Sequence, residues 1–208
     1  MYHFSHFKAK DQQEILEFMN EHPFVFLTGS TKDEKPVATQ IPVILEERDG
    51  ELFLQGHIMR KTDHHKCFEG NENALAVFTG PSCYVSASWY SDQSMGSTWN
   101  YISVHAEGKI RFMSADELLA FMRKFTLKFE GGNTASKTIL DNLSPAYLEK
   151  MMPAIIGIEI KIDRLENVFK LSQNRDAISF NNIIQKLEAI GGESAMVAEE
   201  MRRRVVVG

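Results

Sequence analysis

The chain has 208 residues, of which 43% are hydrophobic and 25% are charged, a composition typical of a folded globular protein that excludes an intrinsically disordered one. The formal net charge of −5 disfavours a protein whose main partner is nucleic acid, unless basic residues cluster locally. Two cysteines, Cys67 and Cys83, are too few for a disulfide framework, so we expect buried thiols in a reducing, cytoplasmic compartment. No apolar run approaches the roughly 20 residues of a membrane-spanning helix.

The first half of the chain predicts one short helix followed by closely spaced strands. A capping box at Asp11 to Glu14 begins the helix, whose apolar residues lie on one face. Only residues 60–72 leave room for another helix before residue 112, so an antiparallel barrel is favoured over a parallel sheet. Six strands, the first two forming a hairpin, are expected over residues 24–28, 36–45, 52–57, 74–79, 83–89 and 99–112.

The second half predicts helices around one late strand. Ser114 begins a capping box and an amphipathic helix, and Ser144 followed by Pro145 begins another. Isoleucines at every second position from Ile156 to Ile162 predict a strand with one apolar and one solvent-facing side. We expect a barrel domain over residues 1–175 and a helical tail over residues 176–208 that packs on the barrel or on a partner subunit.

The strong motifs of nucleotide, metalloprotease and serine hydrolase sites are absent. His57, His64 and His65 lie within nine residues, but no two histidines share a helix face at i, i+4, so no metal site is predicted. The more informative segment follows His57: Arg60 offers a bidentate fork, Lys61 a point charge and the next residue a hydroxyl where a strand turns into a helix. These groups suit a phosphate, although a basic turn is also commonly just solvated.

Two further polar clusters lie beyond residue 97. In the first, Trp99 offers a ring for stacking on a planar ligand and Asn100 an amide for its edge, although such strands often only pack a core. In the second, residues 170–175 place Lys170, Gln173 and Arg175 within six positions, which suits an anion or a heteroaromatic edge, or a capped turn before a helix.

Taken together, these clusters resemble the PaiB-type family of negative transcriptional regulators, within the FMN-binding split-barrel superfamily. The resemblance runs to about residue 190, and its most specific strings are Thr-Trp-Asn-Tyr at 98–101 and Lys-Leu-Ser-Gln-Asn-Arg at 170–175, with Gly-His-Ile-Met-Arg at 56–60. It implies a mainly β fold, a six-stranded antiparallel split barrel with flanking helices, and a homodimer with FMN at the subunit interface. The chain departs from the family pattern after Arg60, where Lys61 and the segment 62–65 replace the usual Asn-Pro-x-Trp.

The resemblance also implies a cofactor site. The second strand would line the isoalloxazine ring, and the turn at Arg60 and Lys61 would hold the phosphate. The candidate cofactor-binding residues are Thr39, Gln40, Ile41, His57, Arg60, Lys61, Trp99, Asn100, Lys170, Gln173 and Arg175.

Several functions are compatible with these observations. The family label implies a negative transcriptional regulator or a flavin-dependent sensor, and the alternatives are an FMN-dependent oxidoreductase acting on a small molecule and a haem-binding protein with His57 or His105 as ligand. DNA contact has weak support, since the only compact basic run is Arg202 to Arg204 and no helix-turn-helix pattern is legible. No residue is recognisable as a nucleophile or general base, so the sequence assigns no reaction.

Overall fold

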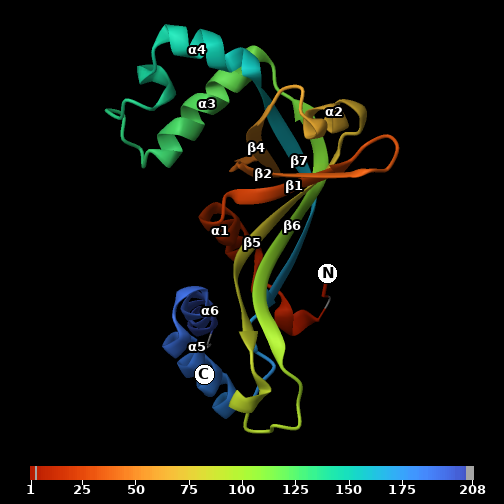
Figure 1. The fold of residues 1–208 in the computed structure, drawn as a ribbon, viewed down its shortest axis with the longest axis vertical. Helices are drawn as coiled ribbons and strands as arrows, with labels where there is room; N and C mark the ends of the chain where they lie inside the picture. Colours follow the sequence, from red (N-terminus) through yellow and green to blue (C-terminus); the bar gives the residue numbers. More distant parts are fainter. Residues whose placement is uncertain (3, 205–208) are drawn as a thin grey trace. The chain divides into compact units, whose positions relative to one another are not determined.

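The computed structural model describes residues 1–2 and 4–204 (Figure 1). Its helices are α1 (Gln12–Glu21), α2 (Asp63–Gly70), α3 (Ala115–Phe129), α4 (Pro145–Met151), α5 (Ala177–Ile190) and α6 (Gly192–Arg203). Its strands are β1 (Phe24–Ser30), β2 (Pro36–Pro42), β3 (Ile44–Arg48), β4 (Glu51–Met59), β5 (Asn73–Val85), β6 (Thr98–Phe112) and β7 (Ile155–Lys170).

All seven strands form one sheet, in the order β2-β1-β5-β6-β7-β4-β3. The pairs β1 with β2, β1 with β5, β3 with β4, and β4 with β7 are antiparallel. The two edge strands, β2 and β3, are consecutive in the chain and are separated only by Val43, which is 2% exposed. The sheet must therefore curl until its edges meet at Val43, which makes it a half-barrel.

The predicted antiparallel sheet with flanking helices is confirmed, with seven strands in place of six. Val43 interrupts the strand expected over residues 36–45, because its amide turns away to bond the carbonyl of Pro23 at 2.8 Å. The strands expected over 74–79 and 83–89 are instead one strand, β5, that ends at Val85 before a short 3-10 turn over Ala87–Trp89.

The chain divides into two compact units, and β5, β6 and β7 contribute residues to both. The first unit comprises Met1–His22, Phe78–Val104 and Glu166–Gly208, and the second comprises Pro23–Val77 and His105–Leu165. In the described part of the chain no helix is long and apolar enough to span a membrane.

In the second unit, α3 packs on the sheet. Leu118 and Phe121 of α3 form a buried cluster with Met113 and Ile155. The solvent-facing side expected for this strand begins only at Lys161, which is exposed, because residues 155–160 are all buried, including Glu159, which is 4% exposed. The predicted capping box at Ser114 is confirmed, with both reciprocal hydrogen bonds present.

In the first unit, α1 and α6 pack against the ends of the long strands. Phe18 of α1 meets Phe169 of β7 edge to face, with ring centroids 5.5 Å apart. Helices α5 and α6 lie side by side (Figure 1) and are joined at Gly191, whose φ of 79° favours glycine. Their shared core includes Ile183, Leu187 and Val197.

Candidate functional site

The turn between β4 and α2 is the first candidate site, and it belongs to the second unit. Thr62 is the N-cap of α2, and its hydroxyl accepts from the amide of His65 at 3.4 Å and donates to the carbonyl of Met59 at 2.8 Å. Lys61 has a positive φ of 66°, and its amide donates to Nδ1 of His65 at 3.1 Å. The threonine and the buried imidazole therefore fix the backbone of the turn.

Arg60 is anchored by its backbone to the turn that precedes β7 and by one side-chain nitrogen to the first residue of β7. Its amide donates to the carbonyl of Ala154 at 2.9 Å, and its Nε donates to the carbonyl of Ile155 at 3.0 Å. The two terminal nitrogens of Arg60 and the ammonium group of Lys61 make no hydrogen bond or ion pair with any other described residue. The backbone and Nε of Arg60 are therefore held by the protein, while its two terminal nitrogens remain available to bind a ligand.

Arg60 is unusual among the nine arginines of the chain. Within the part that the structure describes, only Arg60 and Arg175 have no carboxylate within 4.0 Å. The seven arginines that do are Arg48, Arg111, Arg123, Arg164, Arg202, Arg203 and Arg204. Both exceptions come from the clusters that the sequence singled out.

These donors fit a flavin phosphate. The guanidinium fork matches two phosphate oxygens, and the ammonium group adds a point charge beside it. Asp63 is the opposing charge, and hydrogen bonds from the amide and ring of His64 lower the pKa of this exposed carboxylate. Because Asp63 points to its own neighbour, it forms no ion pair with either cation.

The candidate residues of β2 lie on opposite faces of that strand. Ile41 is buried and faces Gly56, where a Cβ atom would lie 3.2 Å from its Cδ1. Gln40 is exposed and pairs with Phe26 of β1, which is 42% exposed. Thr39 shares the face of Ile41. A flat ligand can therefore lie against the face of Gln40 or that of Thr39 and Ile41, but not against both.

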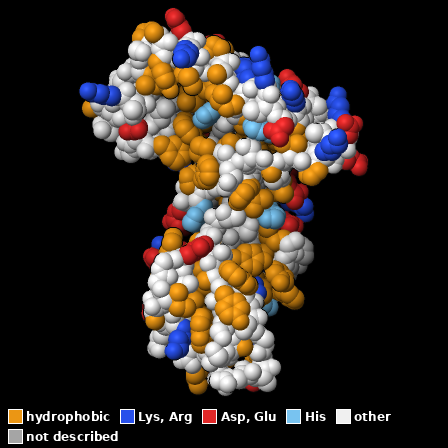
Figure 2. Space-filling model, in the orientation of Figure 1, with side chains coloured by type: hydrophobic (Ala, Val, Ile, Leu, Met, Phe, Trp, Pro, Cys, Tyr) orange, Lys and Arg blue, Asp and Glu red, His pale blue; other side chains and the backbone are white. Residues whose placement is uncertain are grey.

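His57 lies beneath α3 rather than in the turn between β4 and α2. Its ring meets Phe125 edge to face, with centroids 5.5 Å apart, and lies 6.3 Å from Phe121. Nδ1 of His57 is buried without a hydrogen-bond partner, and burial lowers the pKa of the imidazole. Hydrophobic side chains gather over α3 and α4 around this region (Figure 2). In the described chain, no group of three or more His, Cys, Asp or Glu side chains is placed to hold a metal ion.

The other candidates belong to the first unit, where Trp99 is available and Asn100 is not. Trp99 is 56% exposed and forms an edge-to-face pair with the half-exposed Tyr84 at 6.3 Å. Asn100 is fully buried, and its amide accepts from Ser172 at 3.0 Å and contacts the sulfur of Met201 at 3.6 Å. Its amide is thus used inside the protein.

At the end of β7 and in the segment after it, some polar side chains likewise bond within the protein while others remain available to a ligand. Oε1 of Gln173 accepts from the amide of Leu171 at 2.7 Å, and its Nε2 donates to the carbonyl of Phe169, so this side chain closes the local turn. Lys170 donates to the hydroxyl of Thr98. Arg175 lies over the ring of Tyr90, 4.3 Å from its centroid.

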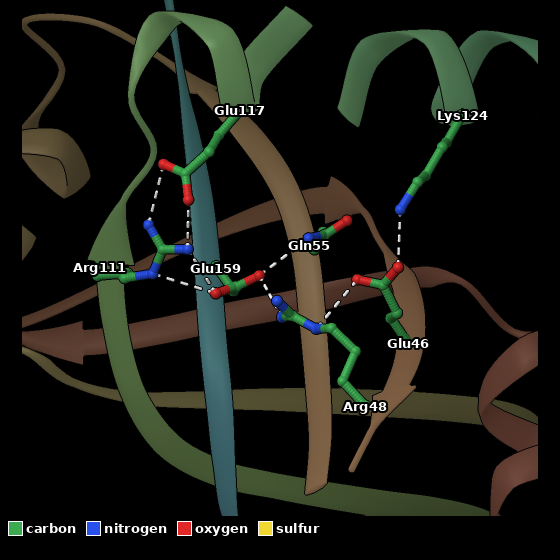
Figure 3. A network of polar contacts seen from close by, with 7 residues as sticks. All are labelled: Glu46, Arg48, Gln55, Arg111, Glu117, Lys124 and Glu159. Carbon is green, nitrogen blue, oxygen red and sulfur yellow. Dashed lines mark hydrogen bonds and ion pairs between the residues drawn. The ribbon is translucent and has the colours of Figure 1, made fainter. Parts of the chain in front are cut away.

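Sequence reasoning missed a polar network around the buried Glu159 in the second unit (Figure 3). The carboxylate of Glu159 accepts from Arg48 at 2.5 Å, Arg111 at 2.7 Å and Gln55 at 2.9 Å. Arg111 also pairs with Glu117 of α3 at 2.7 Å, so the network ties the helix to the sheet. Hydrogen bonds from Gln55 and the two arginines outweigh burial and lower the pKa of Glu159. No sequence motif marks these residues as partners.

The C-terminal arginines, the basic run considered for DNA, are paired with acidic side chains in the first unit. Arg202 contacts Glu188 at 2.8 Å, and Arg203 contacts Glu200 at 3.1 Å. Arg204 is mostly buried and pairs with Glu200 at 2.5 Å and with Glu14 at 3.0 Å. All three arginines are therefore neutralised by ion pairs within the protein, and they do not form an uncompensated basic surface.

The curled antiparallel sheet with flanking helices is the architecture of split-barrel proteins, and comparison with known proteins agrees with it. Residues 1–164 match the family described as "Putative FMN-binding domain". The chain is 34% identical over 188 residues to "Protease synthase and sporulation protein PAI 2" of Bacillus subtilis, covering 90% of this chain and 89% of that protein. The chain therefore belongs to this FMN-binding-domain family, of the PaiB type.

Solved structures show the same fold at low identity. A conserved hypothetical protein from Mycobacterium tuberculosis aligns with a TM-score of 0.56 at 15% identity, covering 82% of this chain and 91% of that one. The "FAD and Heme binding protein" from Mycobacterium smegmatis aligns with a TM-score of 0.55 at 19% identity, covering 88% and 80%. These likenesses support the split-barrel fold.

Proposed function

We propose that this protein binds FMN, with the phosphate held by Arg60 and Lys61 and the ring lying along β2, on either the face of Gln40 or that of Thr39 and Ile41. The observation that carries the proposal is the anchored Arg60, whose fork has no partner among the described residues while a second uncompensated cation lies beside it. Bound flavin supplies one- and two-electron redox chemistry, which the protein tunes through charge and hydrogen bonds near the ring.

The test compares FMN with riboflavin, which lacks the phosphate. We expect FMN to bind purified protein with quenched flavin fluorescence, and Arg60→Gln or Lys61→Gln to raise its Kd about tenfold or more, the effect of losing one charge-assisted hydrogen bond. Riboflavin binding should change little in the same variants. Lys66→Gln is the matched control, because Lys66 is exposed on α2 and contacts no carboxylate among the described residues. Protein that neither carries a yellow chromophore nor gains thermal stability from FMN would refute the proposal.

A homodimer is part of the same proposal. Phe24 and Phe26 on the outer face of β1 are 55% and 42% exposed, and a second copy would cover such a face. Light scattering after size exclusion should give twice the chain mass of 23.7 kDa, and Phe26→Ser should shift the protein towards monomer. A wild-type protein that is monomeric at micromolar concentration would contradict this part.

Use of the flavin as a sensor, including a role as a negative transcriptional regulator, is favoured over turnover of a substrate, because the possible bases at the Arg60 turn, Asp63 and His65, already form hydrogen bonds within that turn. The FMN-loaded protein should be reduced by dithionite yet consume NADH no faster than free FMN does. Sustained NADH consumption by the protein would favour the oxidoreductase alternative. A Soret band on haem addition that is lost in His57→Ala or His105→Ala would favour the haem alternative.

A further inference from the structure

Lys170 and Arg175 of the first unit are a pair of cations without carboxylate partners in the described chain. The ammonium group of Lys170 donates to the hydroxyl of Thr98, a neutral acceptor. The guanidinium of Arg175 stacks on Tyr90 and contacts the sulfur of Met95 at 2.9 Å. Neither cation is neutralised by these contacts.

The backbone between the two cations is held in place from both sides. Ser172 has a positive φ of 62°, a conformation that costs energy for a residue with a side chain, and its hydroxyl donates to the fully buried Asn100. The amide of Arg175 donates to the carbonyl of Ser172 at 3.0 Å, and Gln173 closes the turn from within. The turn therefore presents both cations from a fixed backbone.

Asp176, the carboxylate next to Arg175 in the sequence, forms hydrogen bonds with other residues and does not pair with either cation. Asp176 caps α5, accepting from the amide and hydroxyl of Ser179 at 2.9 and 2.6 Å and from the hydroxyl of Ser91 at 3.0 Å. These bonds lower its pKa to about 2, so it is charged but turned to its own helix. Burial, and then the positive charge of Arg175, lower the pKa of Lys170. The two cations therefore repel one another in the absence of an anion.

We propose that Lys170 and Arg175 form an anion site, separate from the flavin phosphate turn, that binds the carboxylate or phosphate group of a small organic molecule. The guanidinium fork suits either group, and the lysine supplies the second charge. Tyr90, the residue under Arg175, is 3% exposed, and its buried hydroxyl has no partner. Trp99 and Trp89 neighbour Thr98 and Tyr90 in the chain, so tryptophan fluorescence is a suitable readout of binding.

The inference goes beyond the proposed flavin binding, and its test uses the full chain without added flavin. Inorganic phosphate and benzoate are titrated separately at constant ionic strength against chloride, with tryptophan fluorescence and thermal unfolding as readouts. We expect at least one of the two anions to bind, with Arg175→Gln and Lys170→Gln each raising its Kd about tenfold. Lys186→Gln is the control, since Lys186 is exposed on α5 and has no carboxylate partner among the described residues. Which anion binds decides between phosphate and carboxylate.

The same variants separate this site from the flavin site. If the site is distinct, Arg60→Gln leaves anion binding unchanged and Arg175→Gln leaves FMN binding unchanged. The inference is overturned if neither anion binds, if Lys186→Gln weakens binding as much as Arg175→Gln, or if Arg175→Gln abolishes FMN binding. Arg175→Lys keeps the charge, so retained anion binding there, with loss in Arg175→Gln, shows that loss of charge rather than misfolding is responsible.

Discussion

Arg111 joins two carboxylates of opposite burial, since its Nη2 donates at 2.7 Å both to Glu159 on β7 and to Glu117 on α3. The side chain of Glu159 is 5% exposed and that of Glu117 is 44% exposed. Removing one cationic partner of a buried carboxylate is destabilising, because the negative charge is then neither paired nor solvated. The contacts of Arg111 with both glutamates therefore make the docking of α3 on the sheet depend on charge as well as on apolar packing.

Replacement of Arg111 should be costly. Arg111→Met leaves Glu159 with Arg48 and Gln55 alone, and we expect the free energy of unfolding to fall by about 3 kcal/mol. Arg123→Met is the control, because Arg123 and Asp141 form an exposed pair with side-chain exposures of 53% and 58%, worth about 0.5 kcal/mol. Urea unfolding followed by circular dichroism measures both. Equal losses in the two variants would contradict a special role for Glu159.

The same network predicts acid sensitivity. The pKa of Glu117 is lowered to about 2, first by its hydrogen bond with Arg111, and the pKa of Glu159 is lowered as well. A carboxyl group with a depressed folded pKa contributes stability above its unfolded value near 4.5 and loses it as pH falls towards the folded value. We therefore expect stability to fall between pH 5 and pH 2, less steeply in Glu117→Gln. An unchanged slope in that variant would refute the assignment.

Local features of the fold could be predicted because their signals lie within a few residues. The capping box at Ser114 and the N-cap at Ser144 depend only on neighbouring positions, and the structure contains both. Of the capping box predicted at Asp11, the N-cap is present, but the Glu14 carboxylate accepts from the amide of Lys10 instead. The role of Glu159 could not be predicted, because its partner Arg48 lies 111 residues away and the pairing depends on strand register.

The candidate site shows the same limit. The sequence identified the types of residue at Arg60 and Arg175, but whether a carboxylate neutralises each arginine depends on distant packing. The same packing buries Asn100 among Ser172 and Met201 and pairs Arg204 with Glu14, which composition alone does not reveal.

His57 should add a second, milder pH dependence. Burial lowers the pKa of His57, and its Nδ1 has no partner. The unfolded chain therefore binds a proton more readily, so this contribution to stability is complete above pH 6.5 and is lost as pH falls below it. His57→Leu should flatten the stability profile between pH 7 and pH 5 while the leucine still packs against Phe125 of α3 and keeps that helix docked. A profile as steep as that of the wild type would point to other histidines, such as His22, whose pKa burial also lowers.

Arg204 and Arg202 offer a matched comparison within the C-terminal run. The side chain of Arg204 is 13% exposed, pairs with Glu14 and Glu200, and lies over the ring of Phe169 at 4.4 Å. Arg204→Met should destabilise the protein by about 3 kcal/mol, because the partly buried glutamates lose their partner. Arg202→Met should leave the unfolding midpoint almost unchanged, since Arg202 is 58% exposed. The opposite order of effects would show that Arg204 does not hold α6 to α1.

Gly108 of β6 makes the most stringent test of the sheet. A Cβ atom at this position would lie 1.9 Å from the carbonyl oxygen of Lys161 on β7, where only backbone could move to relieve the clash. Gly108→Ala should therefore lower the free energy of unfolding by about 3 kcal/mol through forced separation of the two strands. Gly96→Ala is the control, because nothing lies within 4 Å of its added Cβ, and it should be neutral or slightly stabilising. Parallel urea titrations decide the matter: if Gly108→Ala unfolds at the same denaturant concentration as Gly96→Ala, β6 and β7 do not approach each other as closely as described.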